Sequence, residues 1–235
     1  MWIGIVLISV TLVSCSAPRK DSLSWIALFN GTDLTGWSIV GSHGKAYVEN
    51  GEIVCHMVSN TPEHTFVRTN EKYGDFILEG DCKLDGNIST GFSLRCIDAP
   101  KDAKACLRGY QVKIDPTPRK WTGGIFDDFG GTLTWLCDLA DNPAGREAFK
   151  MNQWNHFRME AIGPEIKVWV NGVPTANIID TKYTQGYIAL KIHSMGNTPE
   201  NEKILMHFKN LRILTSEPQK HSKPMDLPAK RRTPL

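Results

Sequence analysis

Short segments in which apolar and polar residues alternate dominate the chain from residue 45 to residue 214. They are rich in Val, Ile, Phe, Tyr and Trp, and they stop at Gly, Asn or Asp. A period of two places successive side chains on opposite faces of a β-strand, so each segment is expected to be a strand. The expected strands are Lys45–Val48, Glu52–His56, Phe76–Leu84, Gly91–Cys96, Tyr110–Ile114, His156–Ile162, Ile166–Val170, Tyr187–His193 and Leu205–Leu214.

Turn signals separate these segments. Asn50-Gly51 and Asn171-Gly172 are the best hairpin turns, because both residue types tolerate positive φ. Helical periodicity is nearly absent, and one short helix is expected over Asn142–Lys150, with Pro143 near its start. The pattern therefore predicts an all-β sandwich or jelly roll with at most one or two short helices.

Composition and charge exclude two classes of protein. With 41% hydrophobic residues among 235, the chain is too apolar to be disordered and long enough for one large all-β domain or two small ones. Its net charge of +2 lacks the strong excess of basic residues that nucleic-acid binding requires. Part of this excess lies in a basic, proline-rich tail (215–235), which is expected to be an extended wrap or a disordered end, following a folded domain over 22–214.

The first residues have the pattern of an export signal. Trp2–Val13 is almost wholly apolar but too short to span a bilayer, as in a secretory signal peptide. Its end, Leu12-Val13-Ser14-Cys15, resembles the lipobox of bacterial lipoproteins; the alternative is a short buried strand with a chance cysteine. The resemblance implies a signal peptide over 1–15, lipidation of Cys15 and a membrane contact made by acyl chains only. No acidic cluster follows Cys15, which favours an exported lipoprotein facing the periplasm.

The other five cysteines are expected to be mostly small core residues. Their number is odd, and they form no Cys-x-x-Cys pair and no zinc-like spacing with histidine. Cys82 and Cys96 are expected on the apolar face of neighbouring strands, where a disulfide is open but not required.

Polar side chains share one face of three expected strands, opposite the apolar face. They come from the segments around residues 93, 113 and 191. A solvated sheet face is the plain alternative, but a shared face with Gln, Lys, Asp, Arg and His can bind and polarise a hydroxyl-rich substrate. The residues of this face are Ser93, Arg95, Gln111, Lys113, Asp115, Lys191 and His193.

A series of motifs in a fixed order gives a family resemblance. The first is Leu28-Phe29-Asn30-Gly31-Thr32-Asp33-Leu34-Thr35-Gly36-Trp37. The later ones are Tyr73-Gly74-Asp75-Phe76, Thr90-Gly91-Phe92-Ser93-Leu94-Arg95, Gly109-Tyr110-Gln111-Val112-Lys113-Ile114-Asp115, Thr122-Gly123-Gly124-Ile125-Phe126-Asp127, Trp154-Asn155, Val170-Asn171-Gly172 and Gly186-Tyr187-Ile188-Ala189-Leu190-Lys191-Ile192-His193. Together they resemble the 3-keto-disaccharide hydrolase domain family, also called domain of unknown function 1080. This implies a concanavalin A-like jelly roll of two antiparallel sheets, with the site on the concave sheet.

The resemblance also implies cleavage of glycosides that are already oxidised to a ketone at sugar carbon 3. The ketone acidifies the hydrogen on carbon 2, a base removes it, and the substituent on carbon 1 leaves by elimination. Hydration of the product completes a net hydrolysis. Such a site needs a base, an electrophile that stabilises the enolate, and an acid for the leaving oxygen. The carboxylate pattern of jelly-roll glucanases is absent, which argues against ordinary glycosidase action.

Eight residues are candidates for this chemistry. Many family members have Glu at position 113 and Gln at position 191, and the two lysines found here would lower each other's pKa. The predicted catalytic residues are Lys113, Lys191, His193 and Asp127, with Asp127 preferred to Asp128. The predicted substrate-binding residues are Arg95, Gln111, Asp115 and Trp121, while His43 and His64 lie in loops that could reach the site.

No cofactor is required by these residues, although the sequence leaves open a divalent metal bound by His193 with carboxylates. The expected partner is a carbohydrate, and the sequence leaves the oligomeric state open. Two other hypotheses remain, namely a noncatalytic carbohydrate-binding lipoprotein and a structural envelope protein. The sequence permits a site that has lost its catalytic carboxylate and kept binding, but paired replacement at 113 and 191 favours a coherent catalytic subgroup.

Overall fold

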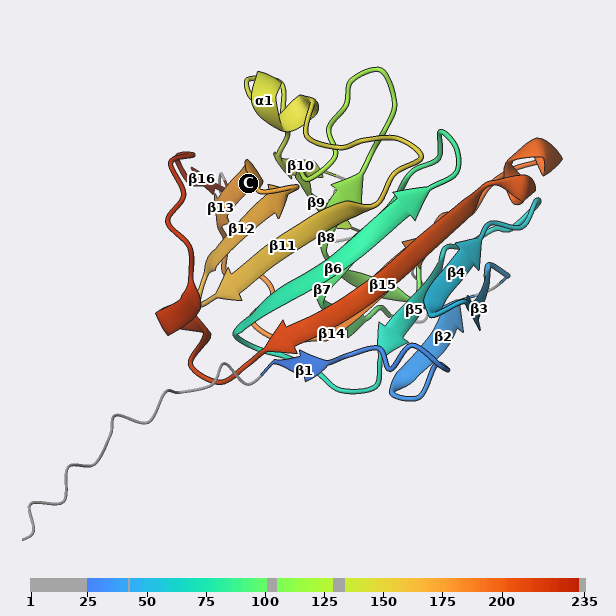
Figure 1. Cartoon of the computed structure of the whole chain (residues 1–235), viewed down its shortest axis with the longest axis horizontal. Helices are drawn as coiled ribbons and strands as arrows, with labels where there is room; N and C mark the ends of the chain where they lie inside the picture. The colour runs from blue at the N-terminus through green and yellow to red at the C-terminus, as the bar shows by residue number, and fades with distance from the viewer. Residues whose placement is uncertain (1–24, 42, 101–104, 129–133, 233–235) are drawn as a thin grey trace, which may run out of the picture.

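Two β-sheets are stacked face to face in the computed structural model, which describes residues 25–41, 43–100, 105–128 and 134–232. Sheet A faces the viewer in Figure 1 and sheet B lies behind it. Sheet A has the order β16 (Lys230–Arg231), β13 (Val173–Ile179), β12 (Glu165–Val170), β11 (Asn155–Ile162), β6 (Phe76–Leu84), β15 (Leu205–Leu214), β4 (Glu52–His56) and β3 (Lys45–Glu49), with β1 (Ile26–Ala27) paired to β15. Sheet B has the order β10 (Thr134–Cys137), β9 (Ile125–Asp128), β8 (Leu107–Ile114), β7 (Thr90–Asp98), β14 (Tyr187–Ile192), β5 (Thr65–Thr69) and β2 (Trp37–Gly41).

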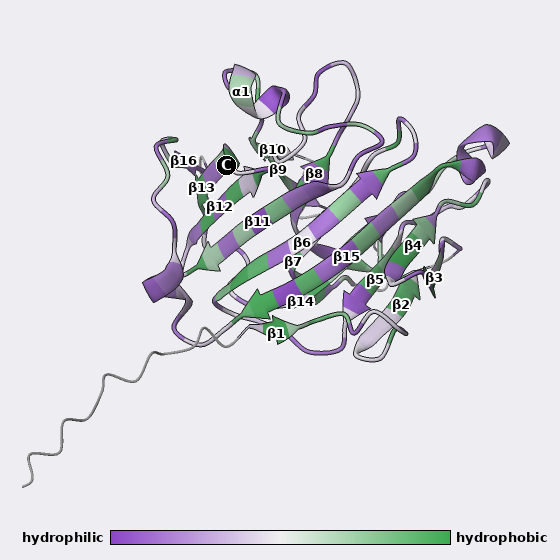
Figure 2. Cartoon of the chain, in the orientation of Figure 1, coloured by the Kyte–Doolittle hydropathy of each residue, from purple (hydrophilic) through white to green (hydrophobic). Residues whose placement is uncertain are grey.

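The core lies between the sheets and is built from the apolar face of each strand. Phe92 of β7 meets two rings of sheet A, with ring centroids 5.2 Å from Phe157 and 5.5 Å from Phe208. Alternating hydrophobic and hydrophilic positions along β6, β11 and β15 are visible in Figure 2. The predicted two-sheet jelly roll is therefore confirmed, and the period of two along each strand is its cause.

The nine expected strands match β3, β4, β6, β7, β8, β11, β12, β14 and β15 with bounds shifted by a few residues at most. Both predicted hairpin turns have positive φ at both residues, 51° and 79° at Asn50-Gly51 and 51° and 81° at Asn171-Gly172. Strands β1, β2, β5, β9, β10, β13 and β16 were not predicted. Four of them, β1, β9, β10 and β16, have four residues or fewer, which is too few to show a period of two.

Helix is confined to short pieces in the described part of the chain. The α-helix α1 covers only Pro143–Arg146, within the expected segment, and Asn142 caps it by accepting from the Gly145 amide at 2.9 Å. Two 3₁₀ helices, η1 (Pro199–Lys203) and η2 (Pro218–His221), complete the set. None of these helices has the length and apolar character needed to cross a membrane.

The C-terminal tail is an extended wrap rather than a disordered end as far as residue 232. After β15 it passes through η2 and runs up the side of sheet A to β16, which pairs in parallel with β13 (Figure 1). Lys167 donates to Ser222 Oγ and to the Lys223 carbonyl, both at 2.7 Å. Asn177 donates to the Leu227 carbonyl at 3.0 Å.

The five cysteines within the described residues are free thiols. Cys82 lies in β6 of sheet A, and Cys96 lies in β7 of sheet B. A β-bulge in β7 turns Cys96 out of the main core. Cys96 packs instead in a smaller apolar cluster with Phe66 and Ala189. The two are therefore not on neighbouring strands as expected, and Cys15 lies outside the described residues.

Candidate functional site

A row of side chains crosses the outer face of sheet B, the face turned away from the core. The strand register places Phe66 of β5 opposite Lys191 of β14, then Gly91 of β7, then Lys113 of β8. Gly91 stands between the two lysines and has no side chain to separate them. A Cβ there would lie 2.4 Å from the Val112 carbonyl oxygen, so the strands leave no room for a larger residue. The register thus brings two lysines from distant segments to one place.

Lys191 forms a buried ion pair at the centre of this row. Its Nζ lies 2.8 and 2.7 Å from the two carboxylate oxygens of Asp128, at the end of β9. Both residues are almost fully enclosed, with 2% and 3% of their surface exposed. Burial lowers the pKa of Lys191, and the charge and hydrogen bonds of Asp128 oppose this fall. Asp128 thereby supports the cationic form of Lys191.

Lys113 has different neighbours. Its Nζ donates to Ser89 Oγ at 3.1 Å and lies 3.2 Å from His193 Nε2, so both contacts are with groups that can be neutral. Burial, and then the positive charge of Lys191, lower the pKa of Lys113 to about 8. At pH 7 roughly a tenth of this amine is therefore neutral, far more than for an ordinary lysine.

Two imidazoles lie beside the lysines. His193 follows β14, and its ring centroid is 4.7 Å from that of His64, in the segment before β5. The Ser194 amide donates to His64 Nδ1 at 2.8 Å, which makes that nitrogen an acceptor. Burial and the charges of Lys191 and Lys113 lower the pKa of His64 to about 3 and hold the pKa of His193 well below its usual value. Both rings are neutral at pH 7, and neutral imidazole is a base.

A second row, next to the first, includes two uncharged polar residues, Ser93 and Gln111. Its register runs from Arg68 through Ala189 and Ser93 to Gln111 and Phe126. Gln111 Oε1 and Ser93 Oγ are buried and have no hydrogen-bond partner among the described residues. Buried polar atoms in proteins are nearly always paired, so these two atoms are suited to contact a polar ligand.

Aromatic rings continue the second row toward the edge of sheet B. Trp135 of β10 pairs with Phe126 in the register, and their ring centroids are 5.4 Å apart. Trp121 lies 5.0 Å beyond Trp135. The Arg119 guanidinium lies 5.2 Å from the Trp121 ring and 5.6 Å from the Trp135 ring. Such half-buried rings are suited to stack on the apolar face of a sugar.

The structure places the predicted residues Lys113, Lys191, His193 and Gln111 together on the outer face of sheet B, with Trp121 at its edge. Asp127 is not there. It pairs with Tyr110 of β8 in the register, so it faces the other side of the sheet, where Lys182 and Arg232 bind it at 2.9 and 2.7 Å. Its neighbour Asp128 faces the lysines, because successive strand residues alternate.

Arg95 also lies away from the lysines. The bulge in β7 between Leu94 and Ile97 interrupts the alternation, and Arg95 adopts a φ of 50°. Its guanidinium donates to the carbonyls of Gly74 and Gly163 at 2.9 and 2.8 Å and binds Asp75 at 3.0 Å. With 1% of its surface exposed, Arg95 joins the two loops that carry these groups and has no surface for substrate.

Asp115 lies close enough to Lys113 to raise the pKa of that amine, but its carboxylate is held in structural contacts. It follows β8 and is fully buried, with its carboxylate bound by Thr117 at 2.8 Å and by Arg119 at 2.6 Å. It organises the turn that begins at Pro116, as expected of an Asp placed before proline.

The prediction missed Phe126 as a site residue, ranked Asp128 below Asp127, and gave His64 only a secondary place. Phe126 and Asp128 alternate with Asp127 and pair with Gln111 and Gly109, so the strand pairing of β9 would have identified them. His64 precedes a strand that was not predicted, and no local signal connects it with His193.

The described residues contain no group of three His, Cys, Asp or Glu side chains arranged to hold a metal ion. His193 and His64 lie beside two lysines, whose positive charges oppose a cation.

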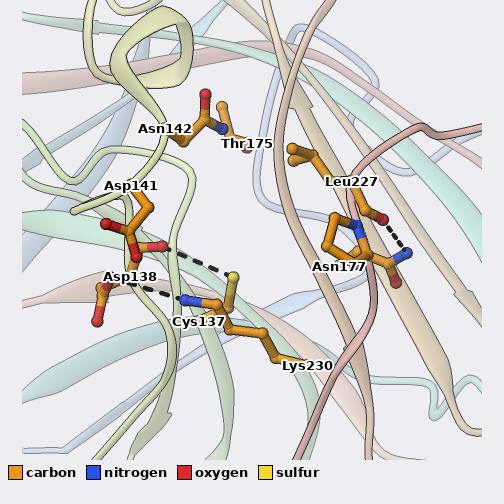
Figure 3. Close-up of a pocket in the computed structure, with 9 residues that line it drawn as sticks. Cys137, Asp138, Asp141, Asn142, Thr175, Asn177, Leu227 and Lys230 are labelled. Atoms are coloured by element: carbon orange, nitrogen blue, oxygen red, sulfur yellow. Dashed lines mark hydrogen bonds and ion pairs between the residues drawn. The ribbon is translucent and has the colours of Figure 1, made fainter.

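A separate cavity of about 130 Å³ lies between β10, β13 and the C-terminal tail. Cys137, Thr175 and Leu227 contribute to its wall, and Lys230 approaches Asp138 to 3.8 Å (Figure 3). None of the predicted catalytic or substrate-binding residues lines it.

Comparison with solved structures supports the fold. A putative glycosyl hydrolase from Parabacteroides distasonis is 19% identical, with a TM-score of 0.58 over 82% of this chain and 94% of the other. The carbohydrate-binding module CBM66 from Bacillus subtilis is 17% identical, with a TM-score of 0.55 over 80% and 99%. The kappa-carrageenase from Pseudoalteromonas carrageenovora is 14% identical, with a TM-score of 0.52 over 86% and 99%.

No curated protein matches the chain. A family model does match it, over residues 24–214, which includes every strand except β16. This agrees with the order of motifs in the sequence and with the jelly-roll structure. The chain therefore belongs to the family of 3-keto-alpha-glucoside-1,2-lyase-like domains.

Proposed function

We propose that this protein cleaves 3-keto-glycosides by elimination across carbons 1 and 2, followed by hydration. The single observation that carries the proposal is the contact between a neutral imidazole, His193, and the Lys113 amine, beside the Lys191–Asp128 ion pair. Membership of the family supports this substrate class, and the site contains the types of group that this reaction needs.

His193 is the proposed base. Its neutral ring accepts the proton from carbon 2, and the resulting imidazolium returns it to the leaving oxygen on carbon 1. One group serves both steps because the two atoms are neighbours on the sugar ring.

The lysines are the proposed electrophilic groups. As the proton leaves carbon 2, negative charge develops on the oxygen at carbon 3, and a nearby ammonium group stabilises it. Asp128 keeps Lys191 protonated for this purpose. Gln111 and Ser93 supply acceptors for sugar hydroxyls, and the aromatic edge formed by Phe126, Trp135 and Trp121 extends the surface toward the aglycone.

The test is incubation of the protein with the 3-keto form of p-nitrophenyl glucoside, with release of p-nitrophenolate as the readout. Release from the ketone and none from the parent glucoside is the expected result, because only the ketone acidifies carbon 2. Absence of release, both with and without added divalent metal, would contradict the proposal.

A noncatalytic carbohydrate-binding function is the second candidate, and the aromatic edge favours it. Stacking rings occur in sites that hold sugars without changing them. This function requires saturable binding of the 3-keto sugar with unchanged substrate, and it requires that His193→Ala leave the affinity nearly intact.

We also propose that the chain is an exported bacterial lipoprotein anchored by acyl chains on Cys15 and facing the periplasm. The apolar run followed by a lipobox-like sequence supports this. Labelling with an alkyne fatty acid should mark the wild-type protein and not Cys15→Ser. Equal labelling of both would contradict it.

A further inference from the structure

The two lysines of sheet B are held in different ways, although they stand in one row. Both carboxylate oxygens of Asp128 bind Lys191. The hydrogen bonds of the Lys113 amine within the described residues go instead to a hydroxyl, on Ser89, and to the neutral ring of His193. The environment therefore favours the ammonium form at Lys191 and accommodates the free amine at Lys113.

A free lysine amine is a nucleophile toward ketones. An amine becomes reactive when it is enclosed and has a second cation beside it, because both conditions disfavour protonation. Lys113 meets both conditions, since 8% of its surface is exposed and Lys191 lies across Gly91 from it. The lowered pKa of Lys113, about 8, agrees with this geometry.

We propose that the Lys113 amine bonds covalently to carbon 3 of the substrate and that the resulting iminium ion, rather than the free ketone, undergoes elimination. This inference rests on the proposed function, because it needs a substrate with a ketone. It assigns different roles to two lysines that the reaction scheme alone would treat as equivalent.

The covalent steps balance without any further reagent. Lys113 Nζ attacks carbon 3, the carbonyl oxygen takes protons, and one water leaves, which forms the C=N bond. His193 removes the proton from carbon 2, and the electron pair moves toward nitrogen to give an enamine. The enamine then returns its electrons, the double bond between carbons 1 and 2 forms, and the aglycone leaves with a proton. One water cleaves the C=N bond and restores the amine.

His193 is placed to serve both halves of this sequence. Its Nε2 lies 3.2 Å from Lys113 Nζ, so it can accept a proton from the attacking nitrogen before it acts on carbon 2. The cationic Lys191 is the neighbour that discourages protonation of Lys113, so it promotes attack without bonding to the substrate.

The experiment is borohydride trapping. The full-length protein is mixed with the 3-keto glucoside and sodium cyanoborohydride, digested and mapped by mass spectrometry. An iminium ion reduced in place leaves the sugar on lysine as a secondary amine, with a mass gain equal to the substrate less one oxygen. The expected adduct is on Lys113, in the peptide that contains Gln111, and it should be absent with the parent glucoside.

Matched variants separate specific from random labelling. Lys113→Arg keeps a cation but cannot form an iminium ion, so it should lose the adduct and roughly 100-fold or more of the aglycone release. Lys209→Arg, on sheet A beside Trp154, should keep both the adduct on Lys113 and the full rate of aglycone release. Far-UV circular dichroism checks that each variant is folded, and Lys113→Met provides a second, uncharged replacement.

The outcomes distinguish the inference from the proposed function. Aglycone release without an adduct on Lys113, or full activity in Lys113→Arg, overturns the covalent step and leaves the lyase function standing. An adduct on Lys113 without aglycone release shows capture of the ketone but overturns elimination, and with it both the lyase function and the proposed role of the iminium ion. If neither the adduct nor aglycone release is found, both the covalent step and the lyase function are overturned.

Discussion

The outer faces of the two sheets both bury charged side chains, but they balance these charges differently. On sheet A, Arg158 donates to Glu79 at 2.7 Å and to Glu160 at 2.8 Å. Arg212 adds a second cation to Glu79, and Lys167 adds one to Glu160 at 3.2 Å. Each carboxylate of this network therefore has two cationic partners.

Sheet A also covers its charges. Burial opposes ionisation of Glu160, but hydrogen bonds from Ser222 and Lys223 of the tail and from Arg158 outweigh it and lower the pKa. Similarly, Arg212 and Arg158 lower the pKa of Glu79 against the effect of burial. The carboxylates of Glu160 and Glu79 therefore stay ionised, and hydrogen bonds satisfy their oxygen atoms.

Sheet B has the opposite balance. Here Asp128 pairs with Lys191, and Asp115 acts on Lys113 from the turn after β8. The pKa of Lys113, Lys191, His64 and His193 is nevertheless lowered in every case. Paired charges on sheet A are suited to hold the structure together. An excess of basic groups on sheet B costs stability and leaves neutral nitrogen atoms, which are the groups that chemistry requires.

The largest expected effect comes from removing the proposed base. His193→Ala should lower aglycone release by about 10² to 10⁴, the usual contribution of a positioned base, with little change in thermal unfolding. The matched control is His156→Ala on sheet A, where the ring binds Asp81 at 2.8 Å and is half exposed. Equal activity in the two variants would remove His193 from the mechanism.

Breaking the sheet A network should affect stability instead of rate. Glu160→Gln leaves Arg158 and Lys167 without full compensation, and a broken buried pair costs about 3 kcal/mol or more of unfolding free energy. Urea unfolding measures this loss, and aglycone release per folded molecule should stay unchanged. Glu147→Gln, which removes an exposed pair with Lys120, is the control and should show no measurable change. A stable but inactive Glu160→Gln would mean that the two faces are coupled.

The rate should depend on the free amine of Lys113. Its pKa of about 8 lies below the ordinary value, so the neutral fraction rises with pH up to about 8 and then levels. Below this value the rate should fall about tenfold per pH unit, after subtraction of the uncatalysed reaction. The charges that act on Lys113 are Lys191, Asp128, Asp115 and Arg119. This fall in rate below about pH 8 should be absent from the residual activity of Lys113→Arg. The same pH profile in that variant would show that another group titrates.

The smallest effect is expected at the aromatic edge. Trp121→Ala should weaken substrate binding by about 1 kcal/mol, seen as a roughly fivefold higher KM with kcat nearly unchanged, because stacking acts equally before and during the reaction. Trp154→Ala on sheet A is the control and should leave KM unchanged. A fall in kcat alone would place Trp121 nearer the reacting atoms.

The strand pattern predicted the fold because burial of one face determines alternate residues, and this rule works over most of the sequence. It also predicted that Lys113, Gln111 and Lys191 lie on one face. It failed where the period of two is interrupted, as at Arg95, where the register of β7 shifts against both of its neighbours, β8 and β14. Asp128 was ranked below Asp127 because β9 has only four residues, too few to show which face is apolar. The contact of His64 with His193 arises only when β5 and β14 pair.

The tail beyond the family match has a consequence for how the molecule behaves in solution. Through β16 it occupies the open hydrogen-bonding groups of β13 at Ile178 and Ile179, and Arg232 binds both Asp127 and Asp180. A chain ended at Leu214 would present that strand edge to other molecules and leave two carboxylates without their guanidinium. Exposed strand edges recruit further strands, so the shortened protein should self-associate in light scattering while the lysine face stays intact.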